Sequence, residues 1–220
     1  MKPIIFNTEM VKAILEGRKT VTRRVVKFKA GKNPNWTGYI KDGLTLYNGK
    51  NEPCSLPIPY HVGDILYVRE TWHKYIKRVG NGKSCRLQEF YGYKASITNY
   101  EDAHEPWKPS IHMPKEAARL FLRVTGVKLE RLQDICNRST PKDHIKRITS
   151  EGLEFQPVME NYQKLIDDFK KLWNSTIKKD KIDTYGWNAN PYVWVVEFEN
   201  ISEEITSANT KIKQEETTND

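Results

Sequence analysis

The most unusual cluster of side chains in this sequence lies at residues 17–24, Gly-Arg-Lys-Thr-Val-Thr-Arg-Arg. It holds four cations and two threonine hydroxyls at a point where a helix would end and the chain would become extended. Cations this close together are favourable only if water solvates them or an anion opposes them. Hydroxyls beside them add donors for a phosphate or a carbonyl oxygen. The stretch therefore predicts either an anion-binding site or a solvated basic edge strand.

Lys19 and Thr22 are the residues of this cluster that could carry out catalysis. A partly buried Lys19 beside Arg23 or Arg24 would have its pKa lowered by the like charges, and such a lysine can act as a base near neutral pH. Thr22 would then attack or orient water, and Arg24 would hold the oxyanion of an amide undergoing hydrolysis. The same side chains would serve equally well as a clamp for a phosphate and a base, without turnover.

Alternate side chains of an extended segment face the same side. If the strand starts at residue 19, two sets lie on opposite faces: Thr20, Thr22 and Arg24 on one, and Lys19, Val21 and Arg23 on the other. If Lys19 instead lies in the turn, it can point to the same side as Thr22.

Four residues outside the cluster are further candidates for contacts with a ligand. Glu70 ends a predicted strand, where its carboxylate would either pair with Arg24 or remain exposed. Trp187 and Tyr192 flank the turn before the last predicted strand, and their rings could stack on a base. His112 has no partner at metal-ligand spacing, which favours a structural or RNA-contacting role. The sequence predicts no metal site and no cofactor.

The elements that would position these residues are short strands and three helices. Hydrophobic periodicity predicts strands at residues 4–6, 65–70, 72–79, 85–93, 120–132 and 192–199, and helices at 9–16, 141–150 and 158–177. Turn signals divide residues 31–59 into a hairpin-bearing insertion, and Gly80-Asn81-Gly82 joins the two strands of a second hairpin. We therefore expect one α+β domain over residues 1–201, built around a small barrel with peripheral helices.

Composition and charge restrict the class of protein. With 220 residues, 38% of them hydrophobic and 29% charged, the chain is typical of a globular protein. Its longest apolar run is far shorter than the roughly 20 residues that cross a bilayer, so we expect no membrane association and a cytoplasmic location. Three widely spaced cysteines, Cys54, Cys85 and Cys136, argue against a disulfide framework and a structural zinc site.

The net charge of +8 is unevenly distributed along the chain. Residues 202–220 carry a net −3 and lack apolar periodicity, which predicts a disordered tail. The remaining +11 makes the folded part strongly basic. Such a charge favours a polyanionic partner, most often nucleic acid, although lysine-rich helices that only maintain solubility would give the same value.

Four stretches occur in a fixed order along the chain: Gly17, Lys19, Thr22 and Arg24 in the pattern GxKxxTxR, then Val62-Gly63-Asp64 before a strand, then residues 132–153, and finally the closing strand at 190–198. Together they resemble the ASCH domain family, over about residues 3–200. The resemblance implies a PUA-like β-barrel with a cleft beside the GxK motif. The insertion at 31–59 is typical of the longer phage and bacterial members.

The resemblance also implies a function for the cleft. PUA-like barrels commonly bind RNA, so the first expectation is a basic cleft for RNA, a nucleotide or a nucleoside, with Arg23 and Arg24 among the ligand-binding residues. A small bacterial member is a metal-free amidohydrolase that deacetylates acetylated cytidine with a lysine, a threonine and a glutamate. Lys19 and Thr22 match its motif, and Glu151 is the match for its glutamate, which would shuttle the proton. A ribonuclease that uses the same cations is the third expectation.

Overall fold

The computed structural model describes residues 1–28, 39–96, 106–137, 141–154 and 162–207, and the chain divides into two compact units. Unit 1 comprises residues 1–16, 65–123 and 200–220, and unit 2 comprises residues 17–64 and 124–199. Helices and strands occur together in both, which confirms the predicted α+β class. In the described parts of the chain, no helix is long and apolar enough to span a membrane.

In unit 1, strand β1 (Lys2–Ile5) pairs in parallel with β6 (Ile65–Arg69), and β6 pairs antiparallel with the first residues of β9 (Phe121–Arg131). Helix α1 (Thr8–Leu15) follows β1 and confirms the helix predicted at 9–16. It begins where the Asn7 side chain accepts a hydrogen bond from the Met10 backbone N–H, and Val11, Ala13 and Ile14 form its buried face.

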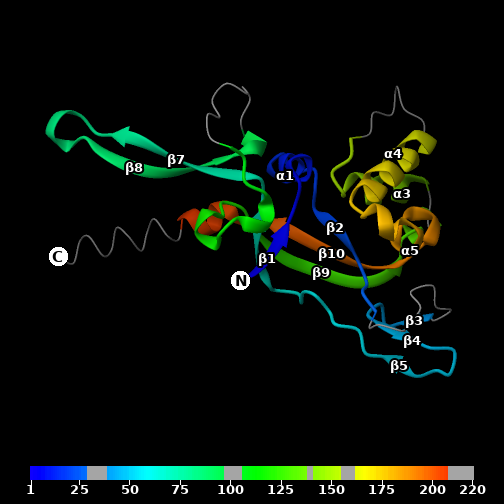
Figure 1. Cartoon of the computed structure of the whole chain (residues 1–220). Coiled ribbons are helices and arrows are strands. Elements are labelled where there is room, and N and C mark those ends of the chain that lie inside the picture. The colour runs from blue at the N-terminus through cyan, green and yellow to red at the C-terminus, as the bar shows by residue number, and fades with distance from the viewer. Residues whose placement is uncertain (29–38, 97–105, 138–140, 155–161, 208–220) are drawn as a thin grey trace. The chain divides into compact units, whose positions relative to one another are not determined.

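A long hairpin is the most extended part of unit 1. Strand β7 (Trp72–Val79) pairs antiparallel with β8 (Arg86–Tyr93) over their whole length, from Trp72 opposite Tyr93 to Val79 opposite Arg86 (Figure 1). The turn between them contains Gly80 and Gly82 with positive φ and the 3-10 helix η1 (Gly82–Ser84). This arrangement confirms the hairpin predicted across Gly80-Asn81-Gly82.

Short 3-10 helices also belong to unit 1. They are η2 (Lys94–Ser96), η4 (Ser110–His112) and η5 (Lys115–Ala117), and a small core cluster forms where Met113 and Ala117 pack against Trp72. The predicted disordered tail starts later than residue 202, because residues 202–207 are helical and the Ser202 hydroxyl accepts a hydrogen bond from the Phe121 N–H. The rest of that predicted tail, residues 208–220, lies outside the described residues.

In unit 2, strand β10 (Tyr192–Asn200) lies between β9 and β2 (Val21–Val25). Strand β10 pairs antiparallel with β2, with Val195 opposite Arg23 and Val196 opposite Thr22. Residues 192–196 and Phe198 of β10 are buried, as expected for an apolar central strand. This part of the structure confirms the strands predicted at 120–132 and 192–199.

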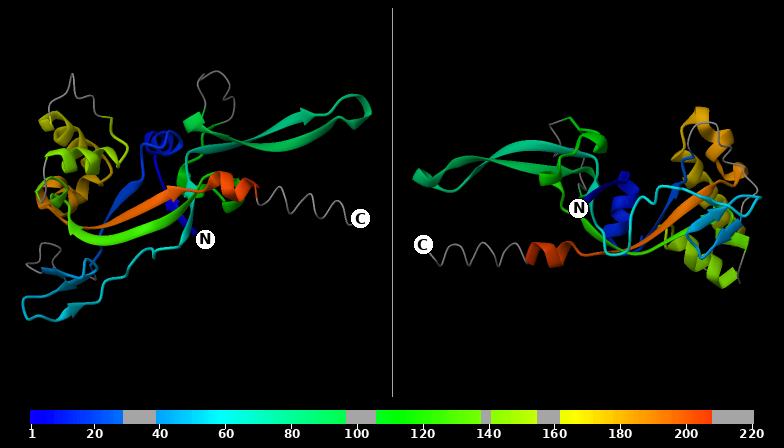
Figure 2. Two further views of the ribbon diagram at one scale, coloured as in Figure 1. Left: turned by 180° about the vertical axis from the view of Figure 1, so that it is seen from behind. Right: turned by 90° about the horizontal axis from the view of Figure 1, so that it is seen from below.

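Helices gather at one end of β9 and β10 (Figures 1 and 2). They are α2 (Asp134–Asn137), α3 (Pro141–Thr149), α4 (Tyr162–Ser175), η6 (Lys179–Lys181), α5 (Ile182–Tyr185) and η7 (Trp187–Ala189). Leu165, Phe169 and Trp173 of α4 form a core with Val193 and Val195 of β10. Helix α4 confirms the helix predicted at 158–177 over Tyr162–Ser175, and the first residues of that predicted helix lie outside the described residues.

The predicted insertion contains a three-stranded antiparallel sheet. Its strands are β3 (Tyr39–Lys41), β4 (Thr45–Tyr47) and β5 (Pro53–Cys54), in the order β3-β4-β5. Asp42 and Gly43 connect β3 to β4 with φ of 57° and 74°, as a tight hairpin turn requires. Within the residues that the structure describes, the strands form open sheets and do not close into a barrel.

Candidate functional site

The centre of the candidate site is an ion pair between Lys19 and Glu151. The Lys19 Nζ lies 2.8 Å from Glu151 Oε2, and it also donates to the carbonyl oxygens of Val21 and Glu151 at 2.8 and 2.9 Å. Three acceptors thus surround an ammonium group whose side chain is fully buried. This coordination matches the three N–H donors of a charged lysine.

Local backbone pairing brings these two residues together. Helix α3 ends at Thr149, and the segment after it turns at Gly152, which has a φ of 97°. The N–H groups of Thr20 and Val21 donate to the Ser150 carbonyl, and Lys19 forms an isolated antiparallel bridge with Glu151. The start of β2 is therefore fixed against the end of α3, which is why residues far apart in the sequence share one site.

The ion pair continues into a chain of alternating charges. Arg23 donates to Glu151 Oε1 at 2.7 Å and to Glu130 Oε1 at 2.9 Å, so it joins the two carboxylates. Arg147 donates to both oxygens of Glu130 at 2.8 Å and to the Asp134 carbonyl at 2.7 Å. Because each charge has an opposite neighbour, burial of this network is tolerated.

Burial and charge pairing shift the pKa of both central groups. Burial lowers the pKa of the Lys19 ammonium, and the Glu151 carboxylate offsets part of that effect. Burial alone would raise the pKa of Glu151, but the charges of Lys19 and Arg23 outweigh it, so that the pKa is lowered. Glu151 is therefore ionised at neutral pH and holds both cations in place.

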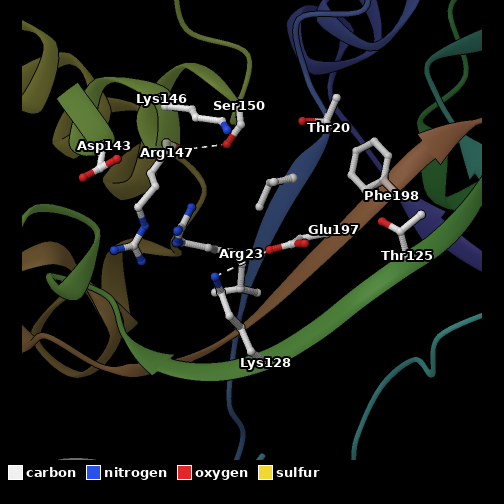
Figure 3. A pocket seen from close by; sticks show the side chains of 12 residues that line it. Thr20, Arg23, Thr125, Lys128, Asp143, Lys146, Arg147, Ser150, Glu197 and Phe198 are labelled. Carbon is white, nitrogen blue, oxygen red and sulfur yellow. Dashed lines mark hydrogen bonds and ion pairs between the residues drawn. The ribbon is translucent and has the colours of Figure 1, made fainter. Parts of the chain in front are cut away.

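A cavity of about 540 Å³ lies beside this network, lined by residues of α3 and of strands β2, β9 and β10. Four cations and two carboxylates line it, together with the hydroxyls of Thr20, Thr125 and Ser150: Arg23, Lys128, Lys146 and Arg147, with Asp143 and Glu197. Figure 3 shows the guanidinium groups of Arg23 and Arg147 close to one another at the base of the cavity, with Lys146 reaching in from α3. This arrangement suits an anion that also carries hydroxyl or carbonyl groups.

The structure brings some of the predicted site residues together and separates others. Lys19, Arg23 and Glu151 are in direct contact. Thr22 is buried on β2 opposite Val196, and strand alternation puts it on the other face from Arg23. Arg24 shares the face of Thr22. The predicted alternation is thus correct for Lys19 with Arg23 and for Thr22 with Arg24.

The other predicted ligand contacts require correction. Glu70 is neither exposed nor paired with Arg24 in the structure, because its buried carboxylate accepts two hydrogen bonds from Arg119, at 2.9 and 3.0 Å. The Trp187 ring packs edge-on against Phe169 in the core of unit 2. The Tyr192 ring is buried beneath the guanidinium of Arg131, 3.8 Å from its centroid. Neither aromatic ring lines the cavity.

Six charged residues of the site are absent from the sequence-based prediction: Lys128, Glu130, Asp143, Lys146, Arg147 and Glu197. Lys128 and Glu130 are two positions apart on a predicted strand, and Lys146 and Arg147 lie in the last turn of a predicted helix. The spacing in the strand indicated one shared face, but nothing in the sequence indicated that this face meets the end of α3. Comparison of the chain with protein-family models, with curated proteins and with solved structures finds no match.

Proposed function

We propose that the cationic cavity of unit 2 binds the phosphate of a nucleotide, either free or as part of RNA. The observation that carries the proposal is the lining of the cavity, in which four cations face two carboxylates. Lys128 lies 3.5 Å from Glu197, so this carboxylate neutralises one of the cations. Arg23 and Arg147 already bind Glu130 and Glu151, so a phosphate would be held by Lys146 together with the remaining N–H groups of the two arginines.

Preorganisation of the two arginines supports this proposal. Arg23 and Arg147 both donate to Glu130, so their guanidinium groups are fixed before any ligand arrives. Fixed donors lose less conformational entropy on binding than flexible ones. Lys146, which is exposed, would supply a mobile third cation. The volume is within the range of about 300–1,000 Å³ that small-molecule sites occupy.

We propose that the chain is a longer member of the ASCH family with a PUA-like barrel. Support comes from the order of the four sequence stretches and from the contact between Lys19 of the GxK motif and Glu151. A crystal structure of the full chain in which five or more strands close into a barrel would establish this fold. Strands that remain open over the whole chain would reject it.

A second candidate function is the deacetylation of an acylated cytidine-type nucleoside. The observation that favours it is the lowered pKa of buried Lys19, in direct contact with the Glu151 carboxylate. The three acceptors around Lys19 Nζ favour the charged form, in which the nitrogen has no lone pair to accept a proton. Thr22 lies on the opposite face of β2. For these reasons binding without turnover is the function we favour.

Isothermal titration calorimetry of the protein with cytidine monophosphate tests the favoured function. Lys146→Gln should weaken binding about tenfold, the size expected for the loss of one charge-assisted hydrogen bond. The matched control is Lys142→Gln, because Lys142 is an exposed lysine of the same helix that does not line the cavity. Equal affinities in both variants and the parent protein would show that the nucleotide binds elsewhere.

Two further incubations separate binding from catalysis. With acetylated cytidine as the substrate, we expect no release of acetate, and with labelled RNA we expect retention of the intact strand. Acetate release that Lys19→Arg abolishes would establish the amidohydrolase instead, because arginine cannot be deprotonated near neutral pH. Shortened RNA products would indicate the ribonuclease.

A further inference from the structure

The β7–β8 hairpin of unit 1 is a two-stranded ribbon with an unusual distribution of charge. Residues 72–93 carry five cations, Lys74, Lys77, Arg78, Lys83 and Arg86, and a single carboxylate, Glu89. Eight residue pairs at about 3.3 Å per residue make a ribbon roughly 26 Å long. Its distal half is exposed. Because a lone two-stranded ribbon is only marginally stable in water, the long exposed part indicates a surface with a role in binding.

The register divides the ribbon into two different faces. One face contains the pairs Lys74 with Tyr91 and Ile76 with Glu89. It therefore carries the single carboxylate of the ribbon, and Glu89 Oε2 lies 2.6 Å from Lys74 Nζ. The side chains of the other face come from four consecutive alternate pairs: His73 with Gly92, Tyr75 with Phe90, Lys77 with Gln88, and Val79 with Arg86. We call this second set the aromatic face. Its charged residues, Lys77 and Arg86, are both positive and exposed.

Aromatic rings form a row along this face. Tyr75 and Phe90 stack with centroids 5.7 Å apart and an angle of 23° between their planes. His73 lies 5.4 Å from Tyr75, and Trp107 lies 4.6 Å from His73. Tyr75 and Phe90 are half-buried, so each ring remains partly accessible. The row therefore leads from the buried base of the hairpin to the exposed cations.

We propose that the aromatic face of the β7–β8 hairpin binds single-stranded RNA. Proteins bind single strands by combining aromatic platforms, on which bases stack, with cations that contact the phosphates. Here the platform is the pair Tyr75 and Phe90, and the cations are Lys77 and Arg86. The absence of carboxylates from the eight residues of this face favours a polyanion over a protein partner. Accessible rings favour a single strand over a duplex, whose bases are already stacked.

This inference does not rest on the proposed function of the cavity. The ribbon belongs to unit 1, and the residues that line the cavity belong to unit 2. A protein that binds nucleotides in the cavity but does not bind RNA through the hairpin would leave the first proposal intact and overturn this one.

The test measures the affinity of the full chain for a fluorescent oligouridylate of about 20 nucleotides, long enough to cover one binding site. The variant Lys77→Gln/Arg86→Gln removes two exposed charges and should bind at least tenfold more weakly. The slope of log affinity against log salt should fall by about 1.4, the value for two phosphate contacts on a single strand. Tyr75→Ala should also weaken binding at least fivefold, and circular dichroism with thermal melting checks that it folds.

Two control variants test separately whether any loss of positive charge weakens RNA binding and whether the opposite face of the ribbon contributes to it. Lys178→Gln/Lys179→Gln removes two exposed charges from unit 2, and Ile76→Gln/Leu87→Gln changes the opposite face of the ribbon. Both should bind the RNA within about twofold of the parent protein, the scatter expected for surface changes away from the contact. The proposal is overturned if Lys77→Gln/Arg86→Gln binds like the parent, if the opposite-face variant weakens binding equally, or if a duplex of the same length binds more tightly than the single strand.

Discussion

At the scale of single residues, the central finding is that the most suggestive cations of the sequence are used inside the protein. Lys19 and Arg23 bind Glu151, and Arg18 donates to the Gly152 carbonyl. The sequence shows the density of positive charge at residues 18–24, but it does not show which carboxylates lie opposite. Cations with internal partners stabilise the fold, so we expect anion binding to depend most on Lys146, an exposed cation of the cavity lining.

Breaking the Lys19–Glu151 pair should destabilise the protein strongly. Lys19→Met leaves Glu151 with Arg23 as its remaining partner in the network, and Glu151→Gln leaves a buried ammonium without its carboxylate. Each single variant should lower the free energy of unfolding by about 3–5 kcal/mol, as expected when one partner of a buried pair is removed. The double variant should lose about 1–3 kcal/mol less than the sum of the two. Urea denaturation followed by circular dichroism measures all three.

The pH dependence of stability provides a control for this interpretation. The pKa of Glu151 is lowered in the folded protein, so its contribution is complete above the unfolded value of about 4.3 and is lost as the pH falls below it. The difference in stability between the parent protein and Glu151→Gln should therefore shrink progressively as the pH falls below about 5. A difference that stays constant over this range would show that Glu151 acts through its shape rather than its charge.

At the scale of elements, local signals predicted most helices and strands correctly. The Asn7 cap, the glycine-rich turn at residues 80–82 and the alternation in β9 depend on neighbours in the sequence, and the structure contains all three elements. Contacts between distant elements were not predictable in this way. The bidentate pair of Glu70 with Arg119 joins residues 49 positions apart, and the spacing of residues in the sequence does not predict such a contact.

Close packing within the β7–β8 hairpin leads to a prediction about Gly92. A methyl group at this position would lie 1.9 Å from His73 Nε2, because the imidazole ring crosses the strand there. Gly92→Ala should therefore lower the stability by about 1–3 kcal/mol, the usual cost of overpacking. Thermal denaturation measures the effect. Removing the ring as well, in His73→Ala/Gly92→Ala, should cost less than the sum of the two single changes.

Gly49→Ala is the matched control for this prediction. Gly49 is exposed, and a methyl group there would have no heavy atom of the described residues within 4 Å, apart from those of its two chain neighbours. The melting temperature of Gly49→Ala should stay within about 2 °C of the parent value, as for most surface changes. An equal loss of stability at both glycines would show that the clash with the His73 ring is not the cause, because Gly→Ala by itself lowers the backbone entropy of the unfolded chain and should not destabilise.

At the scale of the whole molecule, the two units are interleaved along the chain. Unit 1 is assembled from three segments and unit 2 from two, so neither can be cut out as one continuous piece. The sequence predicted a single domain because hydrophobic patterning contains no linker to mark a boundary between the units. Strand β9 itself begins in unit 1 and ends in unit 2.

The two proposed binding surfaces should be distinguishable in the intact chain by the size of the ligand. The affinity for cytidine monophosphate should fall in Lys146→Gln but not in Lys77→Gln/Arg86→Gln, because a single nucleotide occupies only the cavity. The affinity for a flexible oligouridylate of about 30 nucleotides should fall both in Lys146→Gln and in Lys77→Gln/Arg86→Gln, since each surface contributes phosphate contacts. Fluorescence anisotropy at several salt concentrations measures the oligonucleotide, and calorimetry measures the nucleotide. A long RNA that responds to only one set of substitutions would show that RNA uses a single surface of this protein.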